Sequence, residues 1–243
     1  MYNTLLVQPL INLLVFFYNL FWHDFGLAVV ALTVLIRLLL YPSFKHQLEA
    51  QKKLSQLQPQ LQVLKEKHKG DREAHAKAQM EFYKTNKVNP FSSCLPLVIQ
   101  LVILFALYRV FFTGLNGQAL QSLYPFITNP GSINHISMGF LDLSKPNLYL
   151  ALITGVFQFF QSKMMISLQP KPVAGSKNPE DMAANLSASM SKSMLYIFPV
   201  MTVWIGATLP AGLALYWLIT TVFSIVQQYI IMRDNKKPLT SNN

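Results

Sequence analysis

The chain has 243 residues, of which 52% are hydrophobic and only 12% are charged, and its formal net charge is +10. Soluble domains carry roughly twice this share of charged residues, so the composition excludes an ordinary soluble domain. Long runs almost free of charge alternate with polar segments that hold nearly all the Lys and Arg residues. Since apolar runs of about 20 residues cross a bilayer as helices, this pattern indicates an integral membrane protein rather than a nucleic-acid-binding one.

The first segment, 1–24, is predicted to be an extracytoplasmic helix that lies in the membrane interface. Its apolar stretch, 9–22, is short for a membrane span, and a true span is the alternative. The polar side chains Gln8, Asn12, Asn19 and His23 fall on one helical face, as in helices that lie along a membrane surface. The first 24 residues contain no Lys or Arg, so no cleavable signal peptide is expected.

Five apolar runs then predict five transmembrane helices. They cover residues 25–44, 91–113, 147–166, 193–209 and 211–232. The remaining segments are the polar stretch 45–89, the loops 114–146 and 167–192, and the tail 233–243. Pro210 to Gly212 leaves so short a link that the last two spans are expected to form an antiparallel hairpin.

The polar stretch 45–89 is predicted to be a helical hairpin. Its leucines recur at heptad spacing, at positions 54, 57, 61 and 64, which is typical of a helix–helix seam. The run from His68 to Asp71 supplies a turn, and Pro59 is expected to kink the first arm.

The positive charges predict the orientation. Ten of the 20 Lys and Arg residues lie in 45–89. The loop 167–192 and the tail 233–243 are also basic, whereas the loop 114–146 carries only Lys145. Because cytoplasmic loops are enriched in Lys and Arg, the N-terminus is expected outside and the C-terminus in the cytoplasm.

Arg37 is the one charge well inside a predicted span. It lies about seven residues, or roughly 10 Å by helical rise, from the cytoplasmic end of that span. An arginine there either extends its guanidinium to the headgroups or faces a polar cavity. Thr33 and Tyr41, at i−4 and i+4, favour the cavity because they place polar groups on the same face.

Three other spans carry polar residues at helical spacing. These are Gln100 in the second span, Thr154, Gln158 and Gln161 in the third, and Trp217, Thr221, Ser224 and Gln228 in the fifth, with Tyr216 beside them. Any one of them could serve only an interhelical hydrogen bond, worth about 0.6 kcal/mol. Together with Arg37, they favour a shared hydrophilic pocket.

Several functional classes have little support. No Asp or Glu lies inside a predicted span, and the single Cys, Cys94, makes no metal-ligand pattern. There is no phosphate-binding loop, zinc-protease helix or nucleophile elbow, so no enzyme, cofactor or metal is expected. A small transporter would predict inverted repeats and paired midplane charges, which are not seen. A structural assembly subunit is the other alternative.

The chain resembles the YidC/Oxa family of membrane protein insertases. The matching segments, in chain order, are Leu32–Arg37, Tyr41–Pro42, Leu57–Pro59, Tyr83–Lys84, Asn89–Pro90, Cys94–Gln100, Phe198–Met201, Pro210–Gly212, Leu215–Trp217 and Gln227–Gln228. Ser92 and Ser93 depart from the family, which commonly has Gly before the Cys. The lipoprotein signal of some family members and the large periplasmic domain of others are also not seen.

The resemblance implies a non-enzymatic insertase and chaperone in the bacterial plasma (inner) membrane. Five helices would enclose a hydrophilic groove, open to the cytoplasm and lipid, with Arg37 in its centre. We expect its polar lining to include Thr33, Gln100, Gln158, Gln161 and Trp217. Tyr216, Trp217 and Phe157 would form a slide along which a substrate helix passes into lipid. New membrane proteins are the expected partners, with the Sec translocon and the ribosome as further candidates and no specific nucleic acid.

Overall fold

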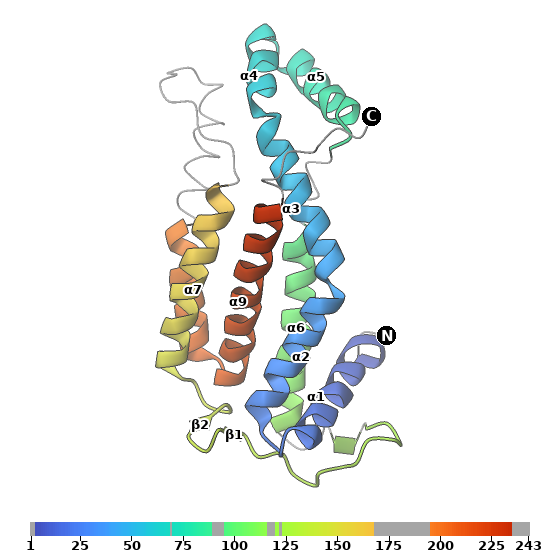
Figure 1. Ribbon diagram of the computed structural model, residues 1–243, viewed down its shortest axis with the longest axis vertical. Helices are drawn as coiled ribbons and strands as arrows, with labels where there is room; N and C mark the ends of the chain where they lie inside the picture. Colours follow the sequence, from blue (N-terminus) through green and yellow to red (C-terminus); the bar gives the residue numbers. More distant parts are fainter. Residues whose placement is uncertain are drawn as a thin grey trace.

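The structure is a computed structural model that describes residues 3–68, 70–88, 95–115, 120–121, 123–167 and 195–234. Most of the predicted loop 167–192 and of the tail 233–243 lies outside these residues, as do Cys94 and the start of the second predicted span. Within the described ranges the chain is mostly helical (Figure 1).

The elements follow one another along the chain with short links. They are the π-helix η1 (Asn3–Val7), α1 (Gln8–Leu20), α2 (Phe25–Leu39), α3 (Tyr41–Gln56), α4 (Gln58–Lys67), α5 (Arg72–Thr85), α6 (Leu95–Leu115), β1 (Ile136–Ser137), β2 (Leu141–Asp142), α7 (Leu148–Ser167), a helix at Leu195–Thr208 and α9 (Ala211–Asp234). The two short strands form an antiparallel pair that the all-α prediction omitted.

The helices meet the coarse expectation of an α-helical membrane protein. Two of them, Asn3–Leu20 and Ala211–Arg233, are long and apolar enough to cross a bilayer, and the bent pair α2–α3 is a third candidate. Ile99–Phe112 and Leu195–Thr208 are shorter apolar helices. In Figure 1, α2, α6, α7 and α9 run side by side, and α4 and α5 extend beyond one end of this bundle.

The first predicted span, 25–44, crosses a break in the helix. α2 ends at Leu39, and α3 begins at Tyr41 with its axis turned by 58°. Pro42 has no N–H to donate to the carbonyl of Leu38, so the ladder of hydrogen bonds stops there. At the start of a new helix this missing donor costs nothing. Arg37 therefore lies two residues from the end of α2, and not seven residues inside a continuous helix.

α4 and α5 pack against each other beyond this break. Pro59 stands in the first turn of α4, directly after the break at Leu57, which is where the sequence placed a kink. Gly70 takes a positive φ of 98° in the turn, a conformation that glycine adopts without steric cost. Asp71 then caps α5 by accepting a hydrogen bond from the Ala74 N–H at 2.9 Å.

The polar residues of α1 bind the outer loop that follows α6. Asn12, which is buried, accepts a hydrogen bond from the Tyr124 N–H at 2.6 Å. Asn19 donates to the carbonyl of Thr128 at 2.8 Å. The polar face that the sequence assigned to the membrane surface thus meets backbone groups of this loop, which would otherwise lack partners.

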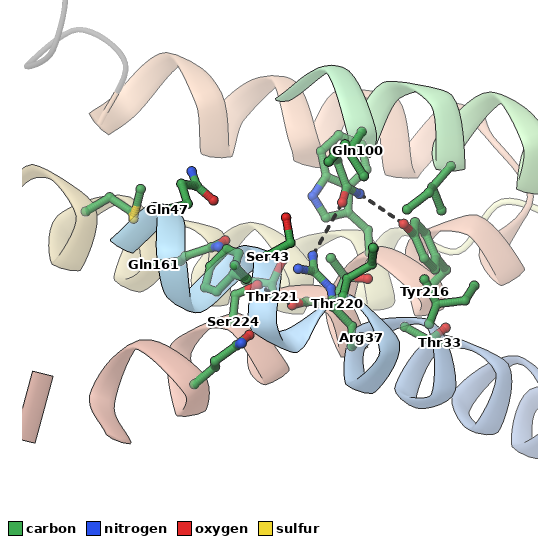
Figure 2. A pocket seen from close by; sticks show the side chains of 18 of the residues that line it. Thr33, Arg37, Ser43, Gln47, Gln100, Gln161, Tyr216, Thr220, Thr221 and Ser224 are labelled. Atoms are coloured by element: carbon green, nitrogen blue, oxygen red, sulfur yellow. Dashed lines mark hydrogen bonds between the residues drawn. The ribbon is translucent and has the colours of Figure 1, made fainter. Parts of the chain in front are cut away.

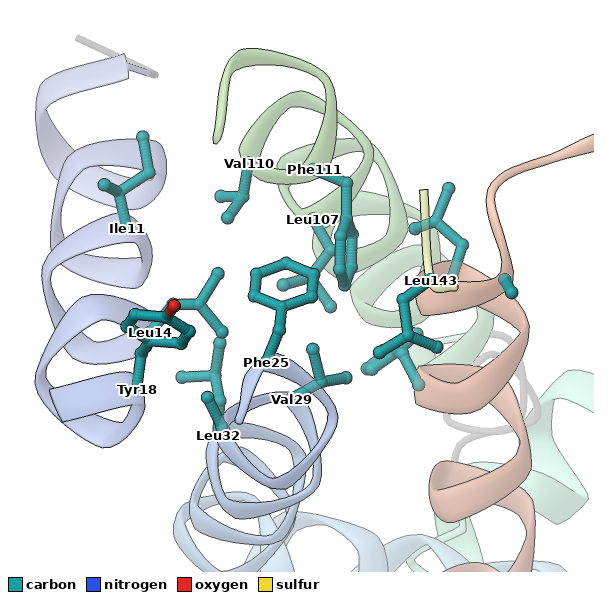
Figure 3. Packing of buried hydrophobic residues seen from close by; sticks show 14 of the residues in the cluster. Ile11, Leu14, Tyr18, Phe25, Val29, Leu32, Leu107, Val110, Phe111 and Leu143 are labelled. Atoms are coloured by element: carbon teal, nitrogen blue, oxygen red, sulfur yellow. The ribbon is translucent and has the colours of Figure 1, made fainter. Parts of the chain in front are cut away.

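An apolar core fills the end of the bundle next to the outer loop. Ile11 and Leu14 of α1, Phe25 of α2, Phe111 of α6 and Leu143 of the loop all point into it (Figure 3). The rings of Phe25 and Phe111 meet edge to face at 5.6 Å. This end of the bundle is consequently packed with side chains.

Asp24 joins α2 to the strand pair. Its carboxylate caps α2 by accepting from the Leu27 N–H at 3.0 Å, and it also accepts from the Ser137 hydroxyl and the Met138 N–H, both at 2.7 Å. Gly26 permits the approach, since a Cβ there would overlap the Ser137 side chain. Burial acts to raise the pKa of Asp24, but these hydrogen bonds outweigh it and hold the pKa below 3.8.

We predict that Asp24→Ala lowers the free energy of unfolding by about 2 kcal/mol. About 1 kcal/mol is the usual worth of an N-cap, and the rest comes from the hydrogen bonds to the loop. Thermal unfolding in lipid nanodiscs measures the loss. Asp71→Ala is the matched control, because it removes a similar cap that has no loop attached. Equal losses in the two variants would show that the loop contacts contribute nothing.

The contribution of Asp24 should also depend on pH. A carboxyl whose pKa is lowered on folding stabilises the protein fully above its unfolded pKa, and this stabilisation disappears as the pH falls through the folded pKa. We therefore expect the stability difference between wild type and Asp24→Asn to be constant from pH 7 to about pH 4 and to shrink below that. A difference that stays unchanged in acid would contradict the ionised tether.

Candidate functional site

A cavity of about 380 Å³ lies between α2, α3, α6, α7, the helix Leu195–Thr208 and α9. Its lining mixes apolar and polar side chains (Figure 2). The polar ones on three separate helices include Arg37, Gln100, Gln158, Gln161, Thr221 and Ser224. Seven segments of sequence distance thus converge on one polar space inside an apolar bundle.

Arg37 is held in this cavity by few contacts. One guanidinium nitrogen donates to Gln100 Oε1 over a long 3.4 Å, and the guanidinium carbon lies 5.9 Å from the centre of the Phe44 ring. Gln100 in turn donates to the Tyr216 hydroxyl at 3.1 Å, as the dashed lines in Figure 2 show. A chain of three polar side chains therefore links α2, α6 and α9.

The cavity carries positive charge that no lining carboxylate balances. Among the described residues that line it there is no Asp or Glu. Arginine has five N–H donors in a planar fork that suits carboxylates, and the single long bond to Gln100 leaves most of that capacity to other groups. The arrangement can bind an anionic group that enters the cavity, whereas it offers no nucleophile beside a base and no cluster of metal ligands within the described chain.

Gln158 connects α7 to α9. Its Oε1 accepts from the Trp217 indole N–H and from the Thr221 hydroxyl, both at 3.3 Å. Gln161, one turn further along α7, lines the cavity but has no hydrogen bond to another described residue. Thr33 donates to the Val29 carbonyl of its own helix at 2.7 Å, so its hydroxyl is satisfied locally.

The structure brings most of the predicted site residues together. Arg37, Thr33, Gln100, Gln158, Gln161, Trp217 and Tyr216 all line the cavity. Phe157 does not, because it lies with Phe160, Lys163 and Ile225 in a separate, largely apolar depression. Helical geometry explains the correction, since neighbouring residues such as Phe157 and Gln158 point about 100° apart. Gln228 is fully buried, but Gln227 is the one that lines the cavity.

Residues of α3 were missed because they were assigned to the hairpin. Ser43, Phe44 and Gln47 all line the cavity. A signal was present, since Thr33, Arg37, Leu40, Phe44 and Gln47 continue one helical face through the break at spacings of three and four residues. Gln227 also binds this segment, donating to the Tyr41 carbonyl at 3.3 Å.

Comparisons with known proteins cover nearly the whole chain. The profile of the family described as "60Kd inner membrane protein" matches residues 16–238. A protein of Geobacter sulfurreducens named "Membrane protein insertase YidC" is 33% identical over 95% of this chain, and one of the same name from Syntrophobacter fumaroxidans is also 33% identical over 95%. The chain spans about 38% of the length of each of these two relatives.

A relative of similar length also matches. The protein of Fusobacterium nucleatum named "Membrane protein insertase YidC" is 31% identical over 86% of this chain and 87% of its own length. The matched region therefore includes every helix that contributes to the cavity.

We predict that Gln158→Leu weakens the packing of α7 on α9. The indole N–H of Trp217 and the buried Thr221 hydroxyl would lose a shared acceptor, at a cost of roughly 1 kcal/mol. Unfolding in detergent measures this loss. Gln161→Leu is the matched control on the same helix, and it should leave stability nearly unchanged. A larger effect at Gln161 than at Gln158 would contradict the assigned bonds.

Proposed function

The chain belongs to the YidC/Oxa family of membrane proteins, and from this premise we propose that it is a membrane protein insertase. It passes substrate transmembrane segments from the cytoplasm into the bilayer and assists their folding and assembly. The observation that carries the proposal is the uncompensated guanidinium of Arg37 in a polar cavity between apolar helices.

The proposal includes five transmembrane helices. They are α2, α6, α7, the helix Leu195–Thr208 and α9, with the N-terminus outside and the C-terminus in the cytoplasm. The parallel arrangement of these helices in Figure 1 and the positive charge of segment 45–89 support this topology. Segment 1–24 remains proposed as the outer interfacial helix, and α4–α5 as the cytoplasmic hairpin that receives substrates.

A groove that reaches part-way through the bilayer lowers the cost of moving a polar tail. Each charge at the bilayer centre costs about 2.5–3.5 kcal/mol by insertion scales. Water admitted to the cavity shortens the apolar path that the tail must cross, and Arg37 attracts acidic groups on the way. A membrane potential, negative inside, adds about 2.3 kcal/mol per negative charge per 100 mV for outward movement.

Burial of the substrate's own apolar segment then completes the transfer. About 20 apolar residues suffice to span the hydrocarbon, so neither a nucleotide nor covalent chemistry is needed. Trp217 and Tyr216 would form part of the slide, together with the apolar cavity residues Phe198 and Met165. Phe157 lies apart from them and would instead face lipid.

Newly made membrane proteins and the lipid bilayer are the proposed partners, and the Sec translocon and the ribosome are further candidates. A small transporter remains an alternative function, which solute flux through vesicles containing only this protein would favour. A structural assembly subunit is the other, for which loss of Arg37 would disturb complex assembly but not insertion.

We predict that Arg37→Ala reduces insertion of a single-span substrate with an acidic N-terminal tail into liposomes. A decrease of about tenfold corresponds to about 1.4 kcal/mol, a reasonable value for one charge–charge contact in a partly wet cavity. Protease protection of the tail measures the insertion. Arg37→Lys should retain part of the activity, because it keeps the charge but not the fork of donors.

Arg109→Ala is the matched control, because it removes an equal charge from α6 at a residue that is absent from the described cavity lining. It should insert the substrate normally. A substrate with a neutral tail should be less sensitive to the loss of Arg37. If both variants insert both substrates as well as wild type does, the attraction to Arg37 plays no part in transfer.

The orientation yields a separate prediction. In a Cys94→Ser background, Ser132→Cys should react with a membrane-impermeant maleimide added to intact cells, while Lys77→Cys should react only after the membrane is opened. Both positions are exposed, so access depends on the side of the membrane alone. The reverse pattern would overturn the proposed topology.

A further inference from the structure

The strand pair of the outer loop has its polar and apolar faces reversed. Ile136 pairs with Asp142, and Ser137 pairs with Leu141. Because side chains alternate along a strand, the Ser137 face and the Ile136 face are opposite. A hairpin with one face in water keeps its polar residues outside. Here the inward residue is the buried Ser137, and Ile136 is 46% exposed.

The turn of this hairpin increases its apolar surface. Met138 is 67% exposed and Phe140 is 79% exposed. The backbone has positive φ at both Met138 (51°) and Gly139 (80°), and the Phe140 N–H donates to the Ser137 carbonyl at 3.2 Å. This is the pattern of a type I′ turn, for which Asn, Asp or Gly is preferred at the Met138 position.

Methionine is thus held in a conformation that costs it about 1–2 kcal/mol. An exposed apolar residue in a strained turn gains nothing from packing within the protein. The cost points to a contact outside the protein that favours an apolar side chain at the tip.

Backbone hydrogen bonds set the hairpin level with the ends of the helices. The Ala211 and Gly212 N–H groups, at the start of α9, donate to the carbonyls of Lys145 and Leu143 at 2.9 and 3.0 Å. The Asp24 carboxylate, at the start of α2, holds Ser137 and Met138. In Figure 1, β1 and β2 lie at the same end of the bundle as the first turns of α2, α7 and α9. The ends of spanning helices lie at the membrane–water interface.

Other exposed rings surround the hairpin at this end of the molecule. Trp22, at the α1–α2 corner, is 84% exposed, and Tyr149, in the first turn of α7, is 80% exposed. Trp and Tyr are enriched where helices meet the headgroup region. The charge of Asp142 is balanced by the Lys145 ammonium group at 2.8 Å, so the hairpin offers the interface an ion pair rather than a net charge.

We propose that the β1–β2 hairpin inserts Ile136, Met138 and Phe140 into the outer leaflet of the membrane and so fixes the depth of the outer end of the bundle. The partner is the phospholipid interface itself. The insertion rests on the proposed extracytoplasmic position of this loop, but not on insertase activity or on Arg37.

Fluorescence quenching in vesicles tests the insertion. Met138→Cys in a Cys94→Ser background is labelled with an environment-sensitive dye, and the full-length protein is reconstituted. Quenching is measured with spin-labelled lipids, whose label sits near the top of the acyl chain, and with aqueous iodide. Phe140→Cys is a second labelled variant, which keeps the test valid if position 138 does not tolerate the change.

Ser132→Cys is the control, because Ser132 is a small, exposed residue of the same loop. We expect several-fold stronger quenching by lipid at positions 138 and 140 than at 132, a blue-shifted emission at both, and the opposite order with iodide. Equal iodide quenching at all three positions would overturn the proposal. Protection of positions 138 and 140 from both quenchers would also overturn it, since protein would then cover the face.

The same experiment separates the insertion from the topology on which it rests. If iodide outside the vesicles fails to reach position 132 in molecules that face outward, the proposed topology has failed. If iodide reaches 132 but lipid does not quench 138 or 140, only the insertion has failed.

Discussion

The guanidinium of Arg37 lies among apolar helices, where a charged group is stable only with polar groups or water around it. Much of the bundle is arranged to satisfy this constraint. α9 contacts α2, α3, α6 and α7, and it turns Thr221, Ser224 and Gln227 toward the protein interior. Gln100 extends the same polar environment from α6. Because each helix contributes only one or two of these groups, the polar space exists only when all the helices are packed together.

The two ends of the bundle differ in a way that follows from this constraint. At the outer end, Phe25, Phe111 and Leu143 fill the space between helices, and Asp24 ties the loop to the first turn of α2. Toward the other end, the break at Leu40 turns α3 away by 58°, and side chains of α3 complete the wall of the cavity. A packed end and a hollow end suit a protein whose polar cargo enters from one side and is released into lipid.

Within the helical bundle, small residues permit this close packing where side chains would separate the helices. A Cβ on Gly155 would overlap Val203 of the neighbouring helix, and one on Gly212 would lie 2.6 Å from the Phe111 ring. Van der Waals contact between closely approaching backbones is the main source of helix association in lipid, which offers no hydrophobic driving force of its own. These contacts hold the walls of the cavity together, while the cavity lining remains polar. The rigid outer end and the polar cavity therefore depend on the same set of close helix contacts.

The sequence by itself determined the class of protein, the approximate positions of the apolar helices, the importance of Arg37 and the family. These depend on local composition and on helical spacing, which one chain displays directly. Tertiary structure decided that Tyr216 lies beside Gln100 and Arg37, that α3 belongs to the cavity wall, and that Phe157 lies outside it. It also revealed that the polar face of α1 binds the outer loop, because a helical face predicts which residues lie together but not which surface they meet. Partners far apart in sequence are chosen by packing, and no spacing rule along one helix contains that information.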